Sequence, residues 1–379
     1  MKITVSAGGR FHAFRLAKQL RKAGYLDKIF TSFPWFSVKD EGLSPEEVEC
    51  LPLKEIIERG FAKVPFLSKA MEIPYYTANL FDRQVSNRIR PCDIFFSWSG
   101  FSLFTLRKIR RAFPAKIILE HTSNHPQGQC KILLEEERIS GSRASQLSSS
   151  FVKKILNEYA EADYIIVPSA LARKTFLERG FDENKVIYVP LGVDIKIFRP
   201  APKNDGVFRI ICIGISINKG IHYVLRAINE LKIDDLEVWL VGQIDNDIKQ
   251  FLKKYQGKFK YLGAIAQKEL YKYYSQASIS ILFSLGEGFG LALLEAMACG
   301  LAVICSDRVG AKDVVREGVD GFVVPVRDVR ALKEKILYFY NNPDICKEMG
   351  IKARKNVTDN FTWDDYGKKI ISVYSGLLR

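Results

Sequence analysis

Short apolar segments alternate with helical segments along the second half of the chain, and this alternation constrains the fold most strongly. Continuous apolar strands separated by helices are typical of a parallel sheet that is covered on both faces. We therefore predict an α/β fold with two Rossmann-like, doubly wound parallel-sheet domains. The expected strands of the second half are residues 208–213, 236–241, 259–262, 279–283, 302–305 and 322–324. The first half repeats the pattern less regularly at residues 3–6, 29–32, 93–98, 116–120, 164–167 and 186–189.

The domain limits follow from an interruption of this pattern. Residues 198–206 contain two prolines and several polar residues, and we place an interdomain linker there. The predicted domains are residues 1–200 and 201–360, followed by a last segment, 361–379. Two such sheets facing each other would bring the carboxyl ends of their strands to one cleft, where open α/β sheets bind ligands. The stretch 33–80 is rich in Pro and aromatic residues, so we expect irregular chain that forms a mobile lip or an acceptor-side insertion.

Composition indicates a globular protein. The chain has 379 residues, of which 47% are hydrophobic and 26% charged, enough for two domains of ordinary size. No apolar run approaches the ~20 residues that a membrane-spanning helix needs. Residues 1–6 resemble a strand entering a Gly loop rather than a signal peptide. The seven cysteines form no CxxC pair, which is typical of reduced thiols, so we expect a cytoplasmic protein.

The net charge of +14 favours an anionic partner. Residues 1–200 carry 31 Lys and Arg against 22 Asp and Glu, so most of the excess lies in the first half. We expect no nucleic-acid partner, because the sequence has neither zinc-ligand spacing nor a known nucleic-acid-binding motif. Residues 103–113 have the pattern of a basic amphipathic helix, which can lie against anionic headgroups. We therefore expect peripheral binding to the inner face of the cell membrane, and a solvated helix face is the open alternative.

Residues 287–298, Glu-Gly-Phe-Gly-Leu-Ala-Leu-Leu-Glu-Ala-Met-Ala, are the most informative segment for function. Glu287 lies in a Gly-rich turn after a predicted strand, and Glu295 lies in a helix that is otherwise apolar. Burying an unpaired carboxylate in such a helix is costly, so a polar group should meet it. The helix N-terminus beside it offers free backbone N–H groups to an anion. A nucleotide sugar has both phosphates and hydroxyls and would satisfy both features, whereas a structural turn with a paired Glu is the alternative.

A second loop of the same predicted sheet is suited to phosphate. Residues 214–220, Gly-Ile-Ser-Ile-Asn-Lys-Gly, follow the first strand of the second half and open a helix. Small residues such as Gly214 and Gly220 let the backbone approach a phosphate, and Lys219 could neutralise it. The alternative is a plain surface lysine.

Two segments of the first half are candidates for the facing side of the cleft. Gly8 and Gly9 lie in the first strand-to-helix loop, which lacks the G-x-G-x-x-G pattern of dinucleotide binding. His12 and Arg15 follow and could face the cleft, although a structural role is equally supported. His121 comes straight after the predicted strand 116–120. A zinc site there lacks a third ligand at fixed spacing, so we favour a hydrogen-bonding role and expect no metal.

Together these segments resemble the family 4 glycosyltransferases, which have the GT-B fold. The strongest part is the stretch 287–300, which is similar to the family's E-x7-E signature. Supporting parts are residues 189–194, 219–220, 303–307 and 320–325, so the resemblance covers nearly the whole chain. It implies two Rossmann-like domains facing across a cleft, with the last helix, 363–378, crossing back to the N-terminal domain.

The resemblance also implies an activity. Members of this family move a sugar from a nucleotide diphosphate sugar to a hydroxyl acceptor, with retention of anomeric configuration and without a metal at the diphosphate. We expect a hexose-type sugar, a UDP-sugar as the favoured donor and GDP-mannose next, and no cofactor. The expected acceptor is a lipid-linked glycan or surface-polysaccharide intermediate, with a soluble acceptor second. A nucleotide-sugar epimerase of the same fold and a non-catalytic sugar-nucleotide-binding protein remain alternatives.

Residue roles come from the same resemblance. The implied catalytic residues are His121 at the transferred sugar, Lys219 at the diphosphate and Glu287 at the sugar hydroxyls. Glu295 would bind the ribose, and His12 and Arg15 are candidates for acceptor binding. The implied donor-binding residues are Gly8, Gly9, Gly214, Lys219, Gly220, Glu287, Gly288, Phe289, Gly290 and Glu295. The sequence departs from the family at position 215, where Ile replaces the usual Arg in a loop one residue short. Arg308 is a candidate substitute.

Overall fold

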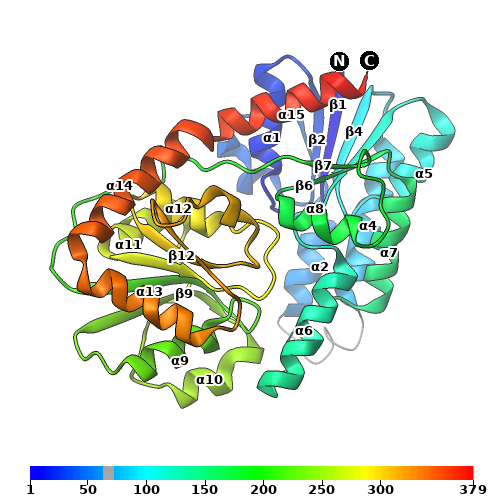
Figure 1. Cartoon of the computed structure of the whole chain (residues 1–379). Helices are drawn as coiled ribbons and strands as arrows, with labels where there is room; N and C mark the ends of the chain where they lie inside the picture. Colours follow the sequence, from blue (N-terminus) through cyan, green and yellow to red (C-terminus); the bar gives the residue numbers. More distant parts are fainter. Residues whose placement is uncertain (63–71, 145, 379) are drawn as a thin grey trace.

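The chain folds into two lobes, each built on a parallel sheet (Figure 1). The computed structural model describes residues 1–62, 72–144 and 146–378. Within these residues the N-terminal sheet has the strand order β3-β2-β1-β4-β5-β6-β7 and the C-terminal sheet the order β10-β9-β8-β11-β12-β13, and all pairings between named strands are parallel. The prediction of two parallel-sheet domains is therefore confirmed.

The N-terminal sheet holds the expected apolar strands and one that was not expected. All five residues of β1 and of β4 are buried, as strands covered on both faces require. The strands are β1 (Ile3–Ala7), β2 (Leu26–Thr31), β3 (Val48–Cys50), β4 (Ile94–Trp98), β5 (Lys116–Glu120), β6 (Tyr164–Val167) and β7 (Val186–Tyr188). The helices are α1 (Ala13–Lys22), α2 (Leu53–Ala62), α4 (Ile73–Arg88), α5 (Leu103–Ala112), α6 (Pro126–Ser140), α7 (Ser149–Glu161) and α8 (Ala170–Leu177).

The C-terminal sheet follows the predicted strands closely, with ends that differ by one to three residues. Its strands are β8 (Phe208–Ile215), β9 (Leu236–Ile244), β10 (Lys260–Tyr261), β11 (Ile279–Leu282), β12 (Ala302–Ser306) and β13 (Gly321–Val324). The helices are α9 (Ile221–Leu231), α10 (Lys249–Lys254), α11 (Leu270–Gln276), α12 (Leu291–Ala298), α13 (Val329–Asn341), α14 (Pro343–Asn360) and α15 (Trp363–Leu377).

The prediction of irregular chain over residues 33–80 is wrong for much of that stretch. It contains β3, α2 and the first half of α4. Pro52 directly precedes α2, and Pro74 lies in the first turn of α4, where a missing N–H costs no hydrogen bond. These prolines therefore mark helix starts rather than loops. Residues 63–71 lie outside the described residues, and the expectation of a mobile lip stays a prediction.

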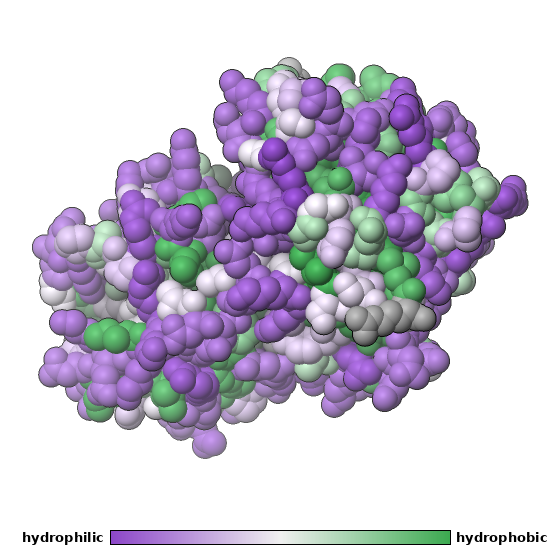
Figure 2. Space-filling model, turned by 90° about the horizontal axis from the view of Figure 1, so that it is seen from above, coloured by the Kyte–Doolittle hydropathy of each residue, from purple (hydrophilic) through white to green (hydrophobic). Residues whose placement is uncertain are grey.

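The chain crosses between the lobes twice, and the two crossings touch. The predicted linker 198–206 contains no helix or strand. After α14, a capping box between Thr362 and Asp365 starts α15, which lies along the N-terminal lobe in Figure 1. The N–H of Val193 donates to Phe361 O at 2.8 Å, which joins the outgoing and the returning chain. One cluster of buried apolar side chains continues from the N-terminal lobe into the C-terminal lobe. The face seen from above is mostly hydrophilic, with apolar residues in small patches (Figure 2).

Candidate active site

Two loops at the carboxyl edge of the C-terminal sheet bring Lys219 and Glu287 together. Lys219 Nζ lies 2.5 Å from Glu287 Oε2, and Ser284 Oγ donates to the same oxygen at 3.3 Å. The backbone of Glu287 is fixed as well, because its N–H donates to Arg308 O at 3.0 Å and its carbonyl accepts from the N–H of Gly310 at 3.0 Å. The side chains of Lys219 and Glu287 remain 27% and 20% exposed. The pair is therefore held firmly but stays accessible to a ligand.

Glycines shape both loops around this pair. Gly214 and Gly220 have φ values of +86° and +68°, which favour glycine. A Cβ atom at Gly220 would lie 2.1 Å from Phe283 O, so a side chain does not fit there. Gly220 and Gly290 directly precede α9 and α12. Two helices thus begin at the edge that carries the Lys219–Glu287 pair, and the free N–H groups and dipoles of their N-termini favour an anion.

The N-terminal lobe touches this site through residues that the sequence analysis did not identify. Ser169 Oγ donates to Gly288 O at 2.6 Å, and a Cβ atom at Gly288 would lie 2.2 Å from Thr122 O. Gln129 Nε2 donates to Asn218 Oδ1 at 2.9 Å. Ser169 follows β6 by two residues, so its position just past the carboxyl end of a strand was the signal that could have found it.

His121 lies at the end of β5 as a buried, neutral imidazole. Its Nδ1 lies 2.7 Å from Ser99 Oγ, and its Nε2 lies 2.9 Å from Asn124 O. A carbonyl oxygen can only accept, so Nε2 carries the proton and Nδ1 accepts from Ser99. Burial lowers the pKa of His121 to about 4. The rings of Tyr159 and Phe176 pack against it, and both ring nitrogens are bonded within the N-terminal lobe.

Glu295 is buried in α12, and two protein groups meet it. Gln267 Nε2 donates to its Oε1 at 3.0 Å, and Tyr274 OH donates to its Oε2 at 3.4 Å. Burial raises the pKa of this carboxyl. Glu295 also lines a small cavity of 80 Å³ between the lobes, which His12 and Arg15 line from the other side. The expected polar partner therefore exists within the protein, and ribose binding by Glu295 stays a prediction.

His12 and Arg15 are both paired. The Nε2 of His12 lies 2.9 Å from a carboxylate oxygen of Glu120, which the sequence analysis did not identify. Trp363 stacks on the His12 ring with centroids 5.6 Å apart. The guanidinium of Arg15 lies 2.9 Å from Asp194. Both residues therefore line the interdomain cavity while bound to carboxylates of the protein, and their predicted role in acceptor binding stays a prediction.

The remaining predicted donor-site residues are Gly8, Gly9, Phe289 and Arg308, and they differ in their packing and contacts. A Cβ atom at Gly8 would lie 2.2 Å from the Phe101 ring, and one at Gly9 would lie 2.8 Å from the Phe11 ring, so packing favours glycine at both positions. The side chain of Phe289 is buried in the apolar core. Arg308 is exposed, and its side chain has no hydrogen bond or ion pair with any described residue.

The described residues contain neither a metal-binding cluster nor a membrane-spanning helix. Within the three described ranges, no group of three or more His, Cys, Asp or Glu could hold a metal ion. No helix in the described part of the chain is long and apolar enough to cross a membrane.

Two facing parallel-sheet lobes with a basic, Gly-rich site at the inner edge have the architecture of the GT-B class. The family model described as Glycosyltransferase Family 4 matches residues 7–197, and the model described as Glycosyl transferases group 1 matches residues 194–356. The chain therefore belongs to glycosyltransferase family 4, as its sequence motifs indicated.

Relatives of known name are distant. The chain is 27% identical over 258 residues to a probable sucrose-phosphate synthase of Thermosipho melanesiensis, covering 64% of this chain and 57% of that protein. It is 28% identical over 245 residues to the phosphatidyl-myo-inositol mannosyltransferase of Mycolicibacterium smegmatis, covering 62% of each. The chain thus spans somewhat under two thirds of the length of these relatives.

Solved structures confirm the GT-B fold. The sucrose-phosphate synthase of Thermosynechococcus elongatus superposes with a TM-score of 0.74 at 19% identity, covering 100% of this chain and 99% of that one. Anabaena HepE in complex with UDP superposes with a TM-score of 0.70 at 16% identity, covering 99% and 100%. HepE has also been solved with UDP-glucose.

Proposed function

We propose that this protein is a retaining, metal-independent glycosyltransferase that moves a hexose from a nucleotide diphosphate sugar to a hydroxyl acceptor. The observation that carries the proposal is the Lys219–Glu287 pair, accessible at the edge where α9 and α12 begin. The ammonium group and two helix N-termini offer positive charge to a diphosphate, and the carboxylate offers an acceptor to sugar hydroxyls.

The chemistry follows from where charge develops. When the anomeric C–O bond breaks, negative charge grows on the leaving nucleoside diphosphate, where Lys219 and the helix N-termini stabilise it. Arg308 is an exposed cation after β12 whose carbonyl accepts from the N–H of Glu287, and it is the proposed substitute for the charge that Ile215 does not supply. Retention then follows from attack of the acceptor on the face that the leaving group vacates, with a phosphate oxygen taking the hydroxyl proton.

A UDP-hexose is the proposed donor. HepE, which shares the fold, has been solved with UDP and with UDP-glucose, and this supports a uridine nucleotide. GDP-mannose is second, because one relative is a mannosyltransferase.

The proposed acceptor is a lipid-linked glycan at an anionic membrane surface. A groove of 680 Å³ between α4 and α5 is lined by four cations, Arg83, Arg107, Lys108 and Arg111. Arg107 is paired with Glu161, whereas Lys108 and Arg111 have no ion pair with any described carboxylate. In the same lobe, α2 packs against α4, and these two helices expose apolar side chains: Leu53 is 46%, Ile56 60% and Tyr76 62% exposed. Cations and exposed apolar groups on adjoining helices suit a charged lipid surface.

Product analysis tests the activity. The protein is incubated with UDP-glucose, UDP-galactose, UDP-N-acetylglucosamine or GDP-mannose, with and without EDTA. NMR follows the release of free nucleoside diphosphate and the anomeric proton of the product. Lys219→Met and Glu287→Gln should lower kcat about 10²- to 10³-fold, the usual effect of removing one group that stabilises the transition state. Lys272→Met is the matched control, because Lys272 forms an exposed pair with Glu269 elsewhere in the same lobe. Full activity of both site variants, or an epimerised donor without diphosphate release, would contradict the proposal.

Vesicle flotation tests the membrane part separately. Binding to vesicles that contain phosphatidylglycerol should be lost in the double variant Lys108→Glu, Arg111→Glu and in vesicles of phosphatidylcholine alone. Equal flotation of the variant would refute the role of this groove while leaving the transfer activity untouched.

A further inference from the structure

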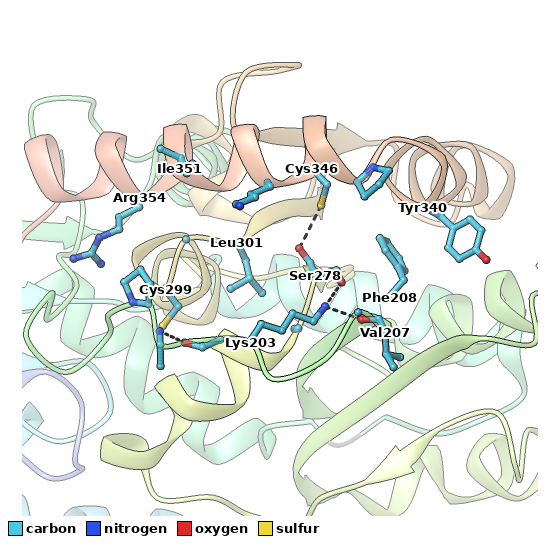
Figure 3. A pocket seen from close by; sticks show the side chains of 18 of the residues that line it. Lys203, Val207, Phe208, Ser278, Cys299, Leu301, Tyr340, Cys346, Ile351 and Arg354 are labelled. Carbon is cyan, nitrogen blue, oxygen red and sulfur yellow. Dashed lines mark hydrogen bonds between the residues drawn. The ribbon is translucent and has the colours of Figure 1, made fainter.

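A large cavity of 990 Å³ lies at the amino edge of the C-terminal sheet (Figure 3). Phe208 is the first residue of β8, and Ser278 and Leu301 directly precede β11 and β12. These residues line the cavity. In a parallel sheet the amino ends share the edge opposite the carboxyl ends, so this cavity and the Lys219–Glu287 site lie at opposite edges of the same sheet. It is a separate site.

Both crossings between the lobes contribute to its walls. Lys203 and Val207 come from the segment that leads from the N-terminal lobe into β8, and Ile351 and Arg354 come from α14, which leads back. Figure 3 shows α14 running over the cavity while Lys203 extends beneath it from the linker. A ligand in this cavity would therefore contact both segments whose geometry sets the relation of the two lobes.

The walls are mostly apolar. Val207, Phe208, Leu301 and Ile351 line the cavity together with the sulfur of Cys346. Ile351 is 63% exposed, although a large aliphatic side chain is normally placed where it can pack. The volume is that of a site for a ligand of ordinary metabolite or lipid size. An occupant with an apolar body would cover this surface.

The cations of the cavity lack carboxylate partners. Lys203 Nζ donates to Val207 O at 2.6 Å and to Ser278 Oγ at 2.8 Å, both neutral. Arg354 donates to backbone carbonyls, and Lys347 has no hydrogen bond or ion pair with any described residue. The acid among the described lining residues, Asp235, accepts from Tyr340 OH at 2.6 Å. Asp205 and Glu237 attract Lys203 electrostatically from beyond ion-pair distance, whereas the exposed Lys347 lines the cavity with no carboxylate partner among the described residues. An unpaired cation beside an apolar cavity favours an anionic ligand.

We propose that this cavity binds an amphipathic anion, a molecule with one phosphate or carboxylate group on an apolar body, and that it is an effector site placed on the two interdomain crossings. The headgroup lies at the exposed Lys347, and the apolar body lies against Leu301 and Ile351. The proposal concerns binding at a second site and does not depend on the donor or acceptor of the transfer reaction.

Calorimetry with the full chain tests it, with dodecyl phosphate below its critical micelle concentration as the probe. We expect saturable binding at one site, at least tenfold weaker in Lys347→Glu and in Ile351→Asp. Both substituted residues are exposed, so the variants should fold as the parent does. Lys153→Glu is the matched control, an exposed lysine without an ion pair in the other lobe. Inorganic phosphate and dodecyl maltoside probe the headgroup alone and the apolar chain with a neutral head, and each should bind at least tenfold more weakly than dodecyl phosphate.

Two results would overturn the proposal: no saturable binding of dodecyl phosphate, or equal binding by Lys347→Glu and by the parent. A further arm separates the sources of such an anion. If Lys347→Glu also reduces flotation with phosphatidic acid vesicles, the ligand is a membrane lipid. If only the monomeric probe is affected, the ligand is a free amphipathic metabolite. A loss of transfer activity in Lys219→Met leaves these outcomes unchanged, so the two proposals fail independently.

Discussion

Acid should destabilise the N-terminal lobe through two buried histidines, because burial lowers the pKa of His121 to about 4 and that of His125 to about 3. His121 is the one whose two ring nitrogens both have hydrogen-bond partners. His121 donates from Nε2 to a carbonyl and accepts at Nδ1 from Ser99, and it is packed between aromatic rings. Protonation would place a charge in this buried site and would require Ser99 Oγ to accept from Nδ1 and to donate to Glu120 O instead. Burial accordingly lowers the pKa of His121 to about 4, from 6.5 in unfolded chain.

The size of this loss of unfolding free energy follows from the difference in proton binding between the folded and the unfolded state. The folded state prefers the neutral ring, so the stability that His121 contributes is fully present above about pH 6.5 and is lost as the pH falls toward 4. At about 1.4 kcal/mol per pKa unit, lowering the pH from 7 to 5 should remove about 1.8 kcal/mol of unfolding free energy on account of this residue alone.

Two measurements check this reasoning. The chain has four histidines, so ¹³C-labelled histidine gives four ring signals that single substitutions can assign. The His121 signal should keep the shift of the neutral Nε2–H tautomer down to about pH 5. Urea unfolding at pH 7 and pH 5 should show a smaller loss in His121→Gln than in the parent, while Ser99→Ala, which retains the imidazole, keeps the loss. A His121 signal that titrates near pH 6.5, or equal losses in parent and His121→Gln, would refute the argument.

Three further substitutions have defined outcomes. The buried carboxylate of Glu136 on α6 accepts across the lobes from Arg327 at 2.8 Å and from His222 and Tyr223. Glu136→Gln should therefore lower the unfolding free energy by about 1–3 kcal/mol and give a larger radius of gyration in small-angle scattering. An unchanged radius would contradict a role of Glu136 in holding the lobes together. Gly288→Ala should weaken the contact between the lobes and raise KM for the donor, since its Cβ would lie 2.2 Å from Thr122 O, and unchanged kinetics would show that the loop yields freely. Thr362→Ala should cost about 1 kcal/mol in thermal unfolding, because it removes the side-chain cap of α15; no shift in Tm would mean that the helix start is held by other contacts.

The sheets could be predicted from sequence because burial on both faces leaves continuous apolar strands. In β4 and β12 all five residues are buried, and runs this short are too brief for a typical helix. The stretch before α4 could not be read in the same way, because Pro and aromatic residues are typical of loops and of helix starts alike. A helix start differs from a loop only in the helical spacing of the apolar residues that follow it.

The sequence predicted which residues of the candidate site follow the carboxyl ends of strands, because polar residues after an apolar strand are easy to recognise. Lys219 and Glu287 were expected at one edge, but their direct pairing depends on loop geometry that no local pattern specifies. Contacts such as His12 with Glu120, 108 residues apart, join segments whose proximity is fixed only by the order of the strands. The amino-edge cavity is built from a linker and a helix without a motif, so nothing in the sequence indicated it.

The return of α15 to the N-terminal lobe has a consequence for how the protein is made. Trp363 and Tyr366 pack against His12, so the surroundings of a residue near the start of the chain are completed by residues near its end. Domains generally fold in the order in which they leave the ribosome. Here the first lobe, which ends near residue 197, must wait with His12 and Phe96 uncovered on one side until about 170 more residues have been synthesised and the second lobe has carried the last helix back. The two lobes are thus separate in architecture but finish folding together.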